Sequence, residues 1–161
     1  MPKDFMPDTT AAALHNRMFF RLFQLGNTLE RQAMKVLGIT PVQWAVLGAL
    51  STPESDNGIL FSDLADYLLV SRQNLDGVLK RLERDACIER VPDATDRRAK
   101  RVRLTATGHT AWEHLQSEMY RFYDQALRGF SLDDKVALMY GLNRLNAGLN
   151  TIETSSQTDT D

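Results

Sequence analysis

Apolar residues recur every three or four positions over long stretches of the chain, a spacing that predicts helices separated by short polar breaks. The first predicted helix runs from about Thr9 to Val36, and Gly38 follows it as a stop signal. Its apolar face consists of Leu14, Met18, Leu22, Leu25 and Leu29. Thr40-Pro41-Val42-Gln43 combines an N-cap, a proline at the first helical position and a capping-box glutamine. It predicts a second helix, apolar and buried, to about Leu50.

Two short helices with a tight break between them are predicted next. Ile59-Leu60-Phe61 fits a short strand, and Ser62 is expected to cap a helix. The inner face of that helix is predicted to hold Leu64, Ala65, Leu68 and Leu69. Val70-Ser71 interrupts the chain before a second helix from Arg72 to Asp85. Its inner face is predicted to hold Leu75, Val78, Leu79 and Leu82. Two helices joined by so few residues predict a helix-turn-helix.

A β-wing and two further helices complete the predicted elements. Ile88 to Val91 and Arg101 to Leu104 fit paired strands around a basic loop. Thr105 is expected to cap a long helix, and Ser131 a last helix that ends near Ile152. The acidic tail, residues 154–161, is expected to be disordered.

Positive charge is concentrated in one part of the chain. Between Arg72 and Arg103 ten Lys/Arg stand against six Asp/Glu, a net charge of +4 in a protein whose total is −2. Such a local excess favours an anionic partner, of which double-stranded DNA is the commonest. The alternative is a solvated surface of mixed charges. The near-neutral total does not argue against DNA, because the field that DNA meets is local.

These elements predict a mainly α fold with a small β-wing. Residues 39–104 would form a winged helix-turn-helix DNA-binding core, flanked by the long N- and C-terminal dimerisation helices of residues 8–38 and 105–153. The terminal helices carry more apolar residues than the small core can cover, and a reader of duplex DNA gains affinity from two-fold symmetry. We therefore expect a homodimer. A monomer whose terminal helices pack on each other is the alternative.

Several classes of protein are disfavoured. No apolar run approaches the roughly 20 residues of a membrane span, the N-terminus lacks the apolar segment of a secretory signal, and one cysteine cannot form an internal disulfide. We expect a cytoplasmic protein. Glycine-rich phosphate loops, catalytic triads and metal-ligand spacings are missing, so we predict no enzyme, no cofactor and no metal site. Cys87 stands in an apolar setting, which favours a buried structural thiol.

The chain resembles the multiple-antibiotic-resistance regulators (MarR family), and among them members that control aromatic-compound catabolism. The motifs that carry the resemblance, in their order, are Gly38–Trp44, Leu64-Ala65, Val70-Ser71-Arg72, Arg81-Leu82-Glu83, Ile88-Glu89-Arg90, Asp96-Arg97-Arg98 and Leu104–Gly108. They extend the match from about Leu14 to Leu149. The resemblance implies an obligate dimer, a palindromic operator and an aromatic or phenolic effector.

Two positions depart from the family pattern. Ala86 stands where a glycine often ends the second helix of the helix-turn-helix, the recognition helix. Asp76 and Gly77 replace residues that are often Thr and Arg. Asp76 would accept a hydrogen bond from a cytosine amino group or repel phosphate. These departures bear on the operator sequence rather than on the fold.

The predicted DNA contacts fall into two sets. The start of the recognition helix would read base edges in the major groove, with Lys80 and Arg81 on phosphates. Its predicted base-reading residues are Ser71, Arg72, Gln73 and Asn74. In the wing, the resemblance implies that Asp96 orders the loop while Arg97 or Arg98 enters the minor groove. Lys100 and Arg101 extend the cationic cluster along the strand, on which charged residues alternate with Val102 and Leu104.

A second candidate site lies on the first helix, which has no acidic residue between Asp8 and Glu30. Arg17 and Arg21 would offer positive charge to an anion, with His15 on the same helix, and Phe20 and Trp44 an aromatic slot. Arginine grips a carboxylate with two hydrogen bonds, so this set suits a small aromatic acid. The alternative is that Arg17 and Arg21 pair with acids of the partner subunit or of the tail.

We therefore expect a ligand-responsive transcriptional regulator, most often a repressor in this family. It would bind a palindromic operator as a homodimer and be released by a small aromatic carboxylate or phenol. The alternative function is a DNA-binding protein of the same fold that senses no small molecule.

Overall fold

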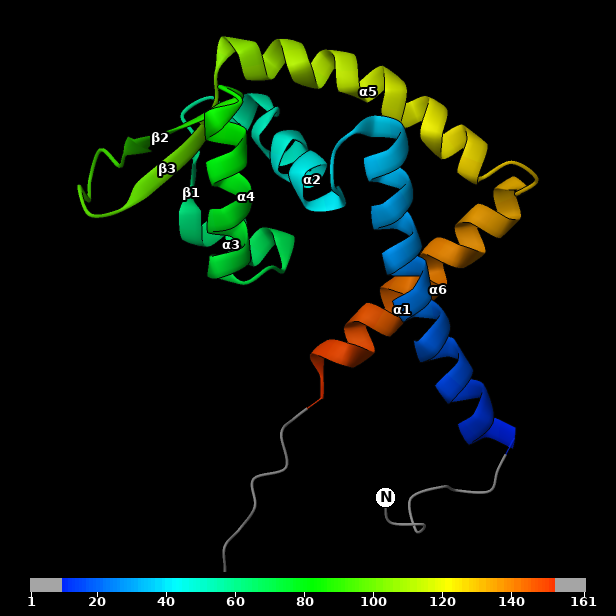
Figure 1. Cartoon of the computed structure of the whole chain (residues 1–161). Coiled ribbons are helices and arrows are strands. Elements are labelled where there is room, and N and C mark those ends of the chain that lie inside the picture. The colour runs from blue at the N-terminus through cyan, green and yellow to red at the C-terminus, as the bar shows by residue number, and fades with distance from the viewer. Residues whose placement is uncertain (1–9, 153–161) are drawn as a thin grey trace, which may run out of the picture. The chain divides into compact units, whose positions relative to one another are not determined.

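The computed structural model describes residues 10–152, which form helices and one small sheet (Figure 1). The helices are α1 (Thr10–Leu37), α2 (Pro41–Leu50), a 3-10 turn η1 (Pro53–Ser55), α3 (Phe61–Leu68), α4 (Arg72–Arg84), α5 (Ala106–Ala126) and α6 (Leu132–Asn150). The strands are β1 (Ile59–Leu60), β2 (Ile88–Pro92) and β3 (Lys100–Leu104). The predicted fold class, mainly α with a small β-wing, is confirmed. The acidic tail lies outside the described residues.

The chain divides into two compact units. The first extends to Phe122 and contains every element from α1 to β3 with most of α5, and the second begins at Tyr123 and contains the end of α5 and α6. The winged helix-turn-helix therefore lies within the first unit.

The predicted helix ends follow from local hydrogen bonds. The Thr40 hydroxyl accepts from the Gln43 N–H while the Gln43 side chain accepts from the Thr40 N–H, so the capping box is confirmed. Ser131 and Asp134 form the same arrangement at the start of α6. Gly38 ends α1 at a φ of +67°, a left-handed conformation that glycine adopts without strain.

Two predictions for α3 are wrong. Ser62 is not the N-cap, because β1 ends at Leu60 and the helix begins at the next residue, which places Ser62 inside the first turn. Leu69 does not face the core, and its side chain is 75% exposed. It ends α3 in the left-handed conformation, at a φ of 55°, and this reversal of the backbone directs the side chain outward.

One apolar core joins the helix-turn-helix to the sheet. The sheet order is β1-β3-β2, fully antiparallel, with Ile59 opposite Val102 and Ile88 opposite Leu104. The residues buried in this core are Val46, Leu47, Leu50, Leu64, Ala65, Leu75, Leu79, Leu82, Ile88, Val102 and Leu104. Because α4 buries the stripe of Leu75, Leu79 and Leu82, its other side must face outward.

The junction between α4, β2 and α5 is close-packed. Ala86 adopts a φ of 57° and donates its N–H to Glu83, while Cys87 donates to Leu82, the pattern of a Schellman cap. The left-handed cap therefore forms without the family's usual glycine. Gly108 packs on the Cys87 carbonyl so tightly that an added Cβ would lie 1.9 Å from its oxygen. Cys87 itself is half-buried, and burial raises the pKa of its thiol.

The long helices expose much of their apolar surface. Ala33 is the residue of α1 that is buried, and α6 buries none of its described side chains. No single helix among the described residues is long and apolar enough to cross a membrane; α1 and α2 taken together reach that length and composition but meet at a bend of 73°.

Candidate nucleic-acid interface

The first turn of α4 carries exposed polar side chains at the predicted base-reading positions. Ser71 is the N-cap, and its hydroxyl accepts a hydrogen bond from the Asn74 N–H at 3.1 Å. Arg72, Gln73 and Asn74 follow on the exposed side of the helix. The buried leucine stripe fixes which side of α4 faces outward, so the helix start extends these side chains away from the core.

Asp76 is neutralised within the protein. Its carboxylate pairs with Lys80 at 2.8 Å, one turn along α4, and with Arg90 of β2 at 2.7 Å. Lys80 and then Arg90 hold the pKa of Asp76 below its usual range. Arg90 also lies 3.2 Å from Glu83, so a single guanidinium links two acids of α4 to the sheet. Asp76 is thus paired with two cations before any contact with a cytosine amino group or a phosphate.

The wing is organised by Asp93, which sequence reasoning did not single out. Its Oδ2 accepts hydrogen bonds from the Thr95 hydroxyl at 2.6 Å and from the N–H groups of Thr95 and Asp96 at 3.0 Å. These bonds, with Thr95 first and Arg101 next, hold the pKa of Asp93 well below its usual range. Asp96 accepts from the Arg98 N–H at 2.9 Å, so the prediction that it orders the loop has local support.

Ion pairing divides the basic cluster into two groups. Arg101 pairs with Asp93, and Arg103 pairs with Glu89 at 2.7 Å. By contrast, the described residues offer no ion pair to four exposed cations. These are Arg72, Arg97, Arg98 and Lys100. Arg81 and Arg84 are likewise exposed, without an ion pair in the described chain. The sequence placed the paired and the unpaired cations in one basic cluster because they are close in sequence. The ion pairs of the folded chain separate the two groups.

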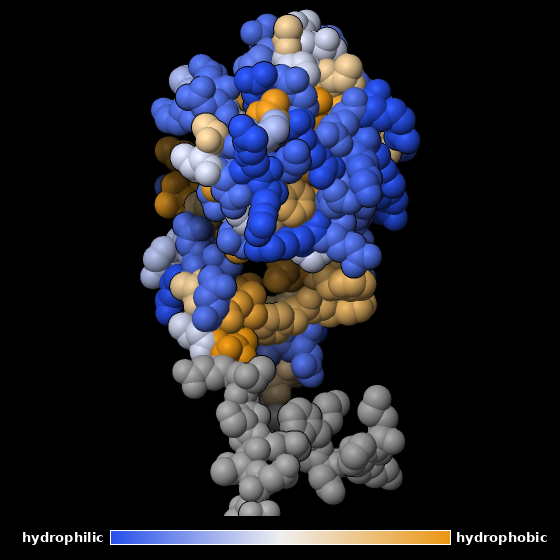
Figure 2. Space-filling view, turned by 90° about the vertical axis from the view of Figure 1, so that its left-hand side faces the viewer, coloured by the Kyte–Doolittle hydropathy of each residue, from blue (hydrophilic) through white to orange (hydrophobic). Residues whose placement is uncertain are grey.

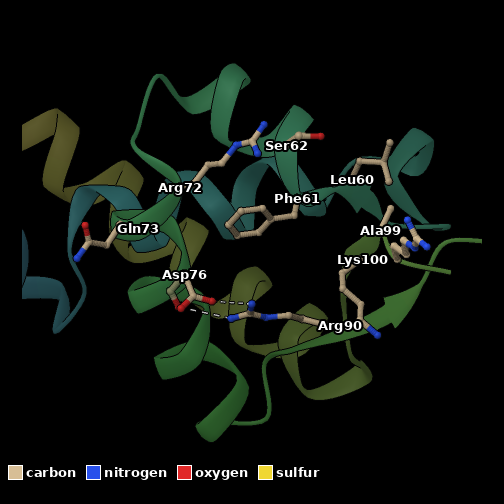
Figure 3. A pocket seen from close by; sticks show the side chains of 10 residues that line it. Leu60, Phe61, Ser62, Arg72, Gln73, Asp76, Arg90, Ala99 and Lys100 are labelled. Atoms are coloured by element: carbon tan, nitrogen blue, oxygen red, sulfur yellow. Dashed lines mark hydrogen bonds and ion pairs between the residues drawn. The ribbon is translucent and has the colours of Figure 1, made fainter. Parts of the chain in front are cut away.

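A cleft of about 580 Å³ lies between α4, the wing and the start of α3. Its lining residues are Leu60, Phe61, Ser62, Arg72, Gln73, Asp76, Arg90, Arg98, Ala99 and Lys100. Figure 3 shows the Phe61 ring between Arg72 and the Asp76–Arg90 pair. Four cations line it against one carboxylate, so the cleft favours an anion. Figure 2 looks onto the wing side, where the upper lobe is predominantly hydrophilic.

The residues predicted to bind an effector are not assembled within one chain. His15, Arg17, Phe20 and Arg21 are exposed on α1, whereas the ring of Trp44 lies edge-on to Phe122 with centroids 6.4 Å apart. Sixteen residues of helix separate Arg21 from the end of α1, a rise of about 24 Å. None of the five lines the cleft or a second cavity of about 490 Å³ that borders α2, α5 and the end of α4.

Asp93 and Arg90 are thus the residues of the site that sequence reasoning missed. The spacing Asp93-Ala-Thr95 is a signal that was available, because aspartate often accepts from the backbone two residues on and so closes a turn. Arg90 had no comparable signal. Its partners Asp76 and Glu83 lie on α4, and only the packing of α4 on β2 brings them close to Arg90.

Comparison with known proteins agrees with this architecture. The MarR family profile matches residues 37–99. The transcriptional activatory protein BadR of Rhodopseudomonas palustris is 44% identical over 136 residues, which span 82% of this chain and 78% of BadR. The homoprotocatechuate degradative operon repressor of Escherichia coli is 28% identical over 118 residues, 73% of this chain and 77% of the repressor.

Solved structures share the fold. A probable transcriptional regulator from Pseudomonas aeruginosa superposes with a TM-score of 0.73 at 26% identity, over 82% of this chain and 98% of that protein. The relatives are transcriptional regulators and not enzymes, as the sequence predicted. With a relative at 44% identity over most of both sequences, and with the winged helix-turn-helix described above, the chain belongs to the MarR family of transcriptional regulators.

Proposed function

We propose that the winged lobe binds double-stranded DNA, with the start of α4 in the major groove and the wing on the backbone and minor groove. The observation that carries this proposal is a set of exposed cations to which the described residues offer no ion pair: Arg72 on one side of the cleft, Arg98 and Lys100 on the wing side, and Arg97 beside them. Intramolecular pairs neutralise Arg101 and Arg103 of the wing, whereas no ion pair within the described residues competes for these four, which are therefore available to phosphate and base edges. Arg81, nine residues after Arg72 on α4, would reach phosphate.

The protein acts as a homodimer on a palindromic operator in this proposal. The apolar side chains that α1 and α6 expose in a single chain supply the surface that a second copy would cover. Two recognition helices related by two-fold symmetry then match two half-sites about one turn of DNA apart. We further propose repression, as the name of the Escherichia coli relative states of that protein; the name of BadR states activation. A reporter fused to the operator decides the sign.

We propose a small aromatic acid or phenol as the effector. Arg17 and Arg21 lie one turn apart and the described residues form no ion pair with either. Because Arg21 and Trp44 are far apart along one chain, they would share a ligand only where α1 of one copy meets α2 of the other. A ligand in such a position would change the separation of the two recognition helices and thus operator affinity.

Binding of DNA is tested with Arg98→Ala and the control Arg103→Ala. Both remove one cation from the same hairpin, but Arg103 already pairs with Glu89. We expect Arg98→Ala to weaken operator binding and to reduce the slope of log K against log salt by about 1 for each phosphate that is no longer neutralised. Arg103→Ala should have a much smaller effect. Equal effects of the two variants would contradict the proposed division of the cations.

Sensing is tested by titrating the protein with its own upstream DNA, in the presence and absence of benzoates and hydroxybenzoates. Release by one compound would support a sensor and name its class, and Arg17→Ala or Arg21→Ala should then abolish the response. Arg31→Ala is the matched control, an exposed arginine further along the same helix. Operator binding that no compound disturbs would favour a DNA-binding protein without an effector.

A further inference from the structure

The wing is fastened to the rest of the lobe through one buried carboxylate. The Asp93 side chain is 6% exposed, and its Oδ2 binds the three donors of Thr95 and Asp96 that close the loop. Its Oδ1 accepts from the Arg101 Nε at 2.5 Å. The same carboxylate therefore folds the tip of the wing and ties it to β3. A buried charge is stable only where donors surround it in this way.

Arg101 extends this connection to a third segment. Its Nη1 donates to the Gly58 carbonyl at 2.8 Å, across 43 positions of sequence. Gly58 has a φ of +81°, and a Cβ there would lie 2.9 Å from the Val102 carbonyl oxygen. Glycine at this position thus allows the turn before β1 to approach β3 so closely that the Arg101 side chain reaches the Gly58 carbonyl. The guanidinium bridges the wing and this turn with two separate nitrogens, which a lysine cannot reproduce.

We propose that Asp93 and Arg101 are positioning residues that hold the wing in its DNA-binding conformation before DNA arrives. Arg101 then acts through Asp93 and Gly58 and not by touching DNA, unlike the neighbouring Arg97, Arg98 and Lys100. This inference rests on the proposed function, because it assumes that the wing contacts DNA. Its physical basis is that a wing ordered in advance spares binding the entropic cost of fixing the backbone of the loop.

The sign of the expected effect separates positioning from simple electrostatics. Asp93→Asn removes a negative charge from a DNA-binding lobe, which by charge alone should strengthen binding. If Asp93 positions the wing, the same variant should weaken operator binding, on the order of tenfold, because the loop must now be ordered on binding. Glu89→Gln is the matched control, since it removes the same charge from an exposed pair on the same hairpin. It should bind as well as the unmodified protein or better.

Two further readouts distinguish positioning from general loss of structure. Backbone amide relaxation of Thr95 to Arg98, measured by NMR without DNA, should show a mobile loop in Asp93→Asn while the helical core stays rigid. In the Asp93→Asn background, Arg98→Ala should cost less affinity than it does in the unmodified protein, because a disordered wing already holds DNA less firmly. An ordered loop in Asp93→Asn, or fully additive losses, would overturn the positioning role.

Arg101→Lys tests the other half of the unit and keeps the charge. It should weaken binding about as much as Asp93→Asn, and the double variant should be no worse than either alone. Full affinity in Arg101→Lys would show that the charge matters and the bridge to Asp93 and Gly58 does not.

The proposal that the wing binds DNA and the proposal that Asp93 and Arg101 position it fail differently. No loss with Arg98→Ala would remove wing contact and positioning together, whereas a normal loss with Arg98→Ala and none with Asp93→Asn would remove positioning alone.

Discussion

Single residues with left-handed backbone define the turns on both sides of α4. Leu69 ends α3 at a φ of 55° and Ala86 follows α4 at 57°, although neither is glycine. An L-residue with a Cβ is disfavoured in this region by about 1–2 kcal/mol. Both turns set the direction of α4, so the chain accepts local strain at each end of this helix.

Replacing Ala86 with glycine should therefore stabilise the protein. Ala86→Gly relieves the left-handed strain and loses part of that gain to the greater freedom of glycine in the unfolded chain, so we expect the free energy of unfolding to rise by about 1 kcal/mol. Urea unfolding followed by circular dichroism measures this change. Leu69→Gly should act in the same direction, because the exposed leucine side chain has little packing to lose. A loss of stability in Ala86→Gly would mean that the cap is not left-handed in solution.

Gly108 is expected to tolerate no side chain. Gly108→Ala would place a Cβ 1.9 Å from the Cys87 carbonyl oxygen, which forces α5 away from β2. We expect a loss of at least about 3 kcal/mol, the upper part of the usual range for overpacking. Gly77→Ala is the contrasting control, since a Cβ there meets nothing within 4 Å and lies inside α4. It should stabilise the helix by about 0.5–1 kcal/mol, and thermal melts of the two variants should move in opposite directions.

Residues could be predicted from sequence where their role depends on near neighbours. Thr40, Ser131 and Gly38 end or begin helices through bonds to residues within four positions, and all three predictions are confirmed. Arg101 reaches a carboxylate eight positions away and a carbonyl 43 positions away. No local pattern specifies such partners, so the sequence could not tell a structural arginine from the exposed arginines beside it, Arg97 and Arg98.

At the scale of elements, the wing depends on acid ionisation. The pKa of Asp93 lies well below its ordinary value of 3.8, so its contribution to stability is complete above about pH 4 and is lost as the pH falls further. The unmodified protein should therefore lose stability between about pH 4 and pH 2 more steeply than Asp93→Asn. Urea unfolding at several pH values measures the difference. Asp76 and Asp134 also have lowered pKa values, but they remain in both proteins and their effects cancel. Parallel pH profiles would contradict this role of Asp93.

The boundaries of the elements were predicted to within a few residues. Periodicity of apolar residues predicted α1 and α4 well, because each carries a continuous apolar stripe, and the capping signals of Thr40 to Gln43 predicted the start of α2. The start of α3 was wrong because a two-residue strand leads straight into it, and pairing with β3 determines where that strand ends. Short elements take their limits from tertiary partners, whereas long ones take them from their own sequence.

For the whole molecule, the fold was predictable from the sequence, whereas the effector site stays a prediction. The order of capping signals, helix-turn-helix and wing indicated one architecture, and the structure confirms it. The residues proposed to hold an effector are separated in one chain because α1 is a single long helix (Figure 1). A site formed by two copies of the chain cannot be predicted from the sequence of one. The proposed sensor therefore depends on the dimer.

The dimer is best tested on α1, where Phe23 is 65% exposed. Covering a phenylalanine with a second copy contributes about 1.5–3 kcal/mol, and a two-fold interface contains two of them. Phe23→Glu removes both and buries charge, so the dissociation constant of the dimer should rise at least about a hundredfold. Sedimentation equilibrium measures it, and operator affinity should fall with it.

Gln24→Glu is the matched control, because it adds the same charge to the neighbouring exposed position of the same helix without removing apolar surface. It should keep the mass of the dimer and most of the operator affinity. The unmodified protein should also melt at a temperature that rises with its concentration, since association stabilises the folded state by mass action. If Phe23→Glu instead remains a dimer of unchanged affinity, α1 does not form the interface. The proposed effector site between copies then fails too, because it needs α1 of one copy beside α2 of the other.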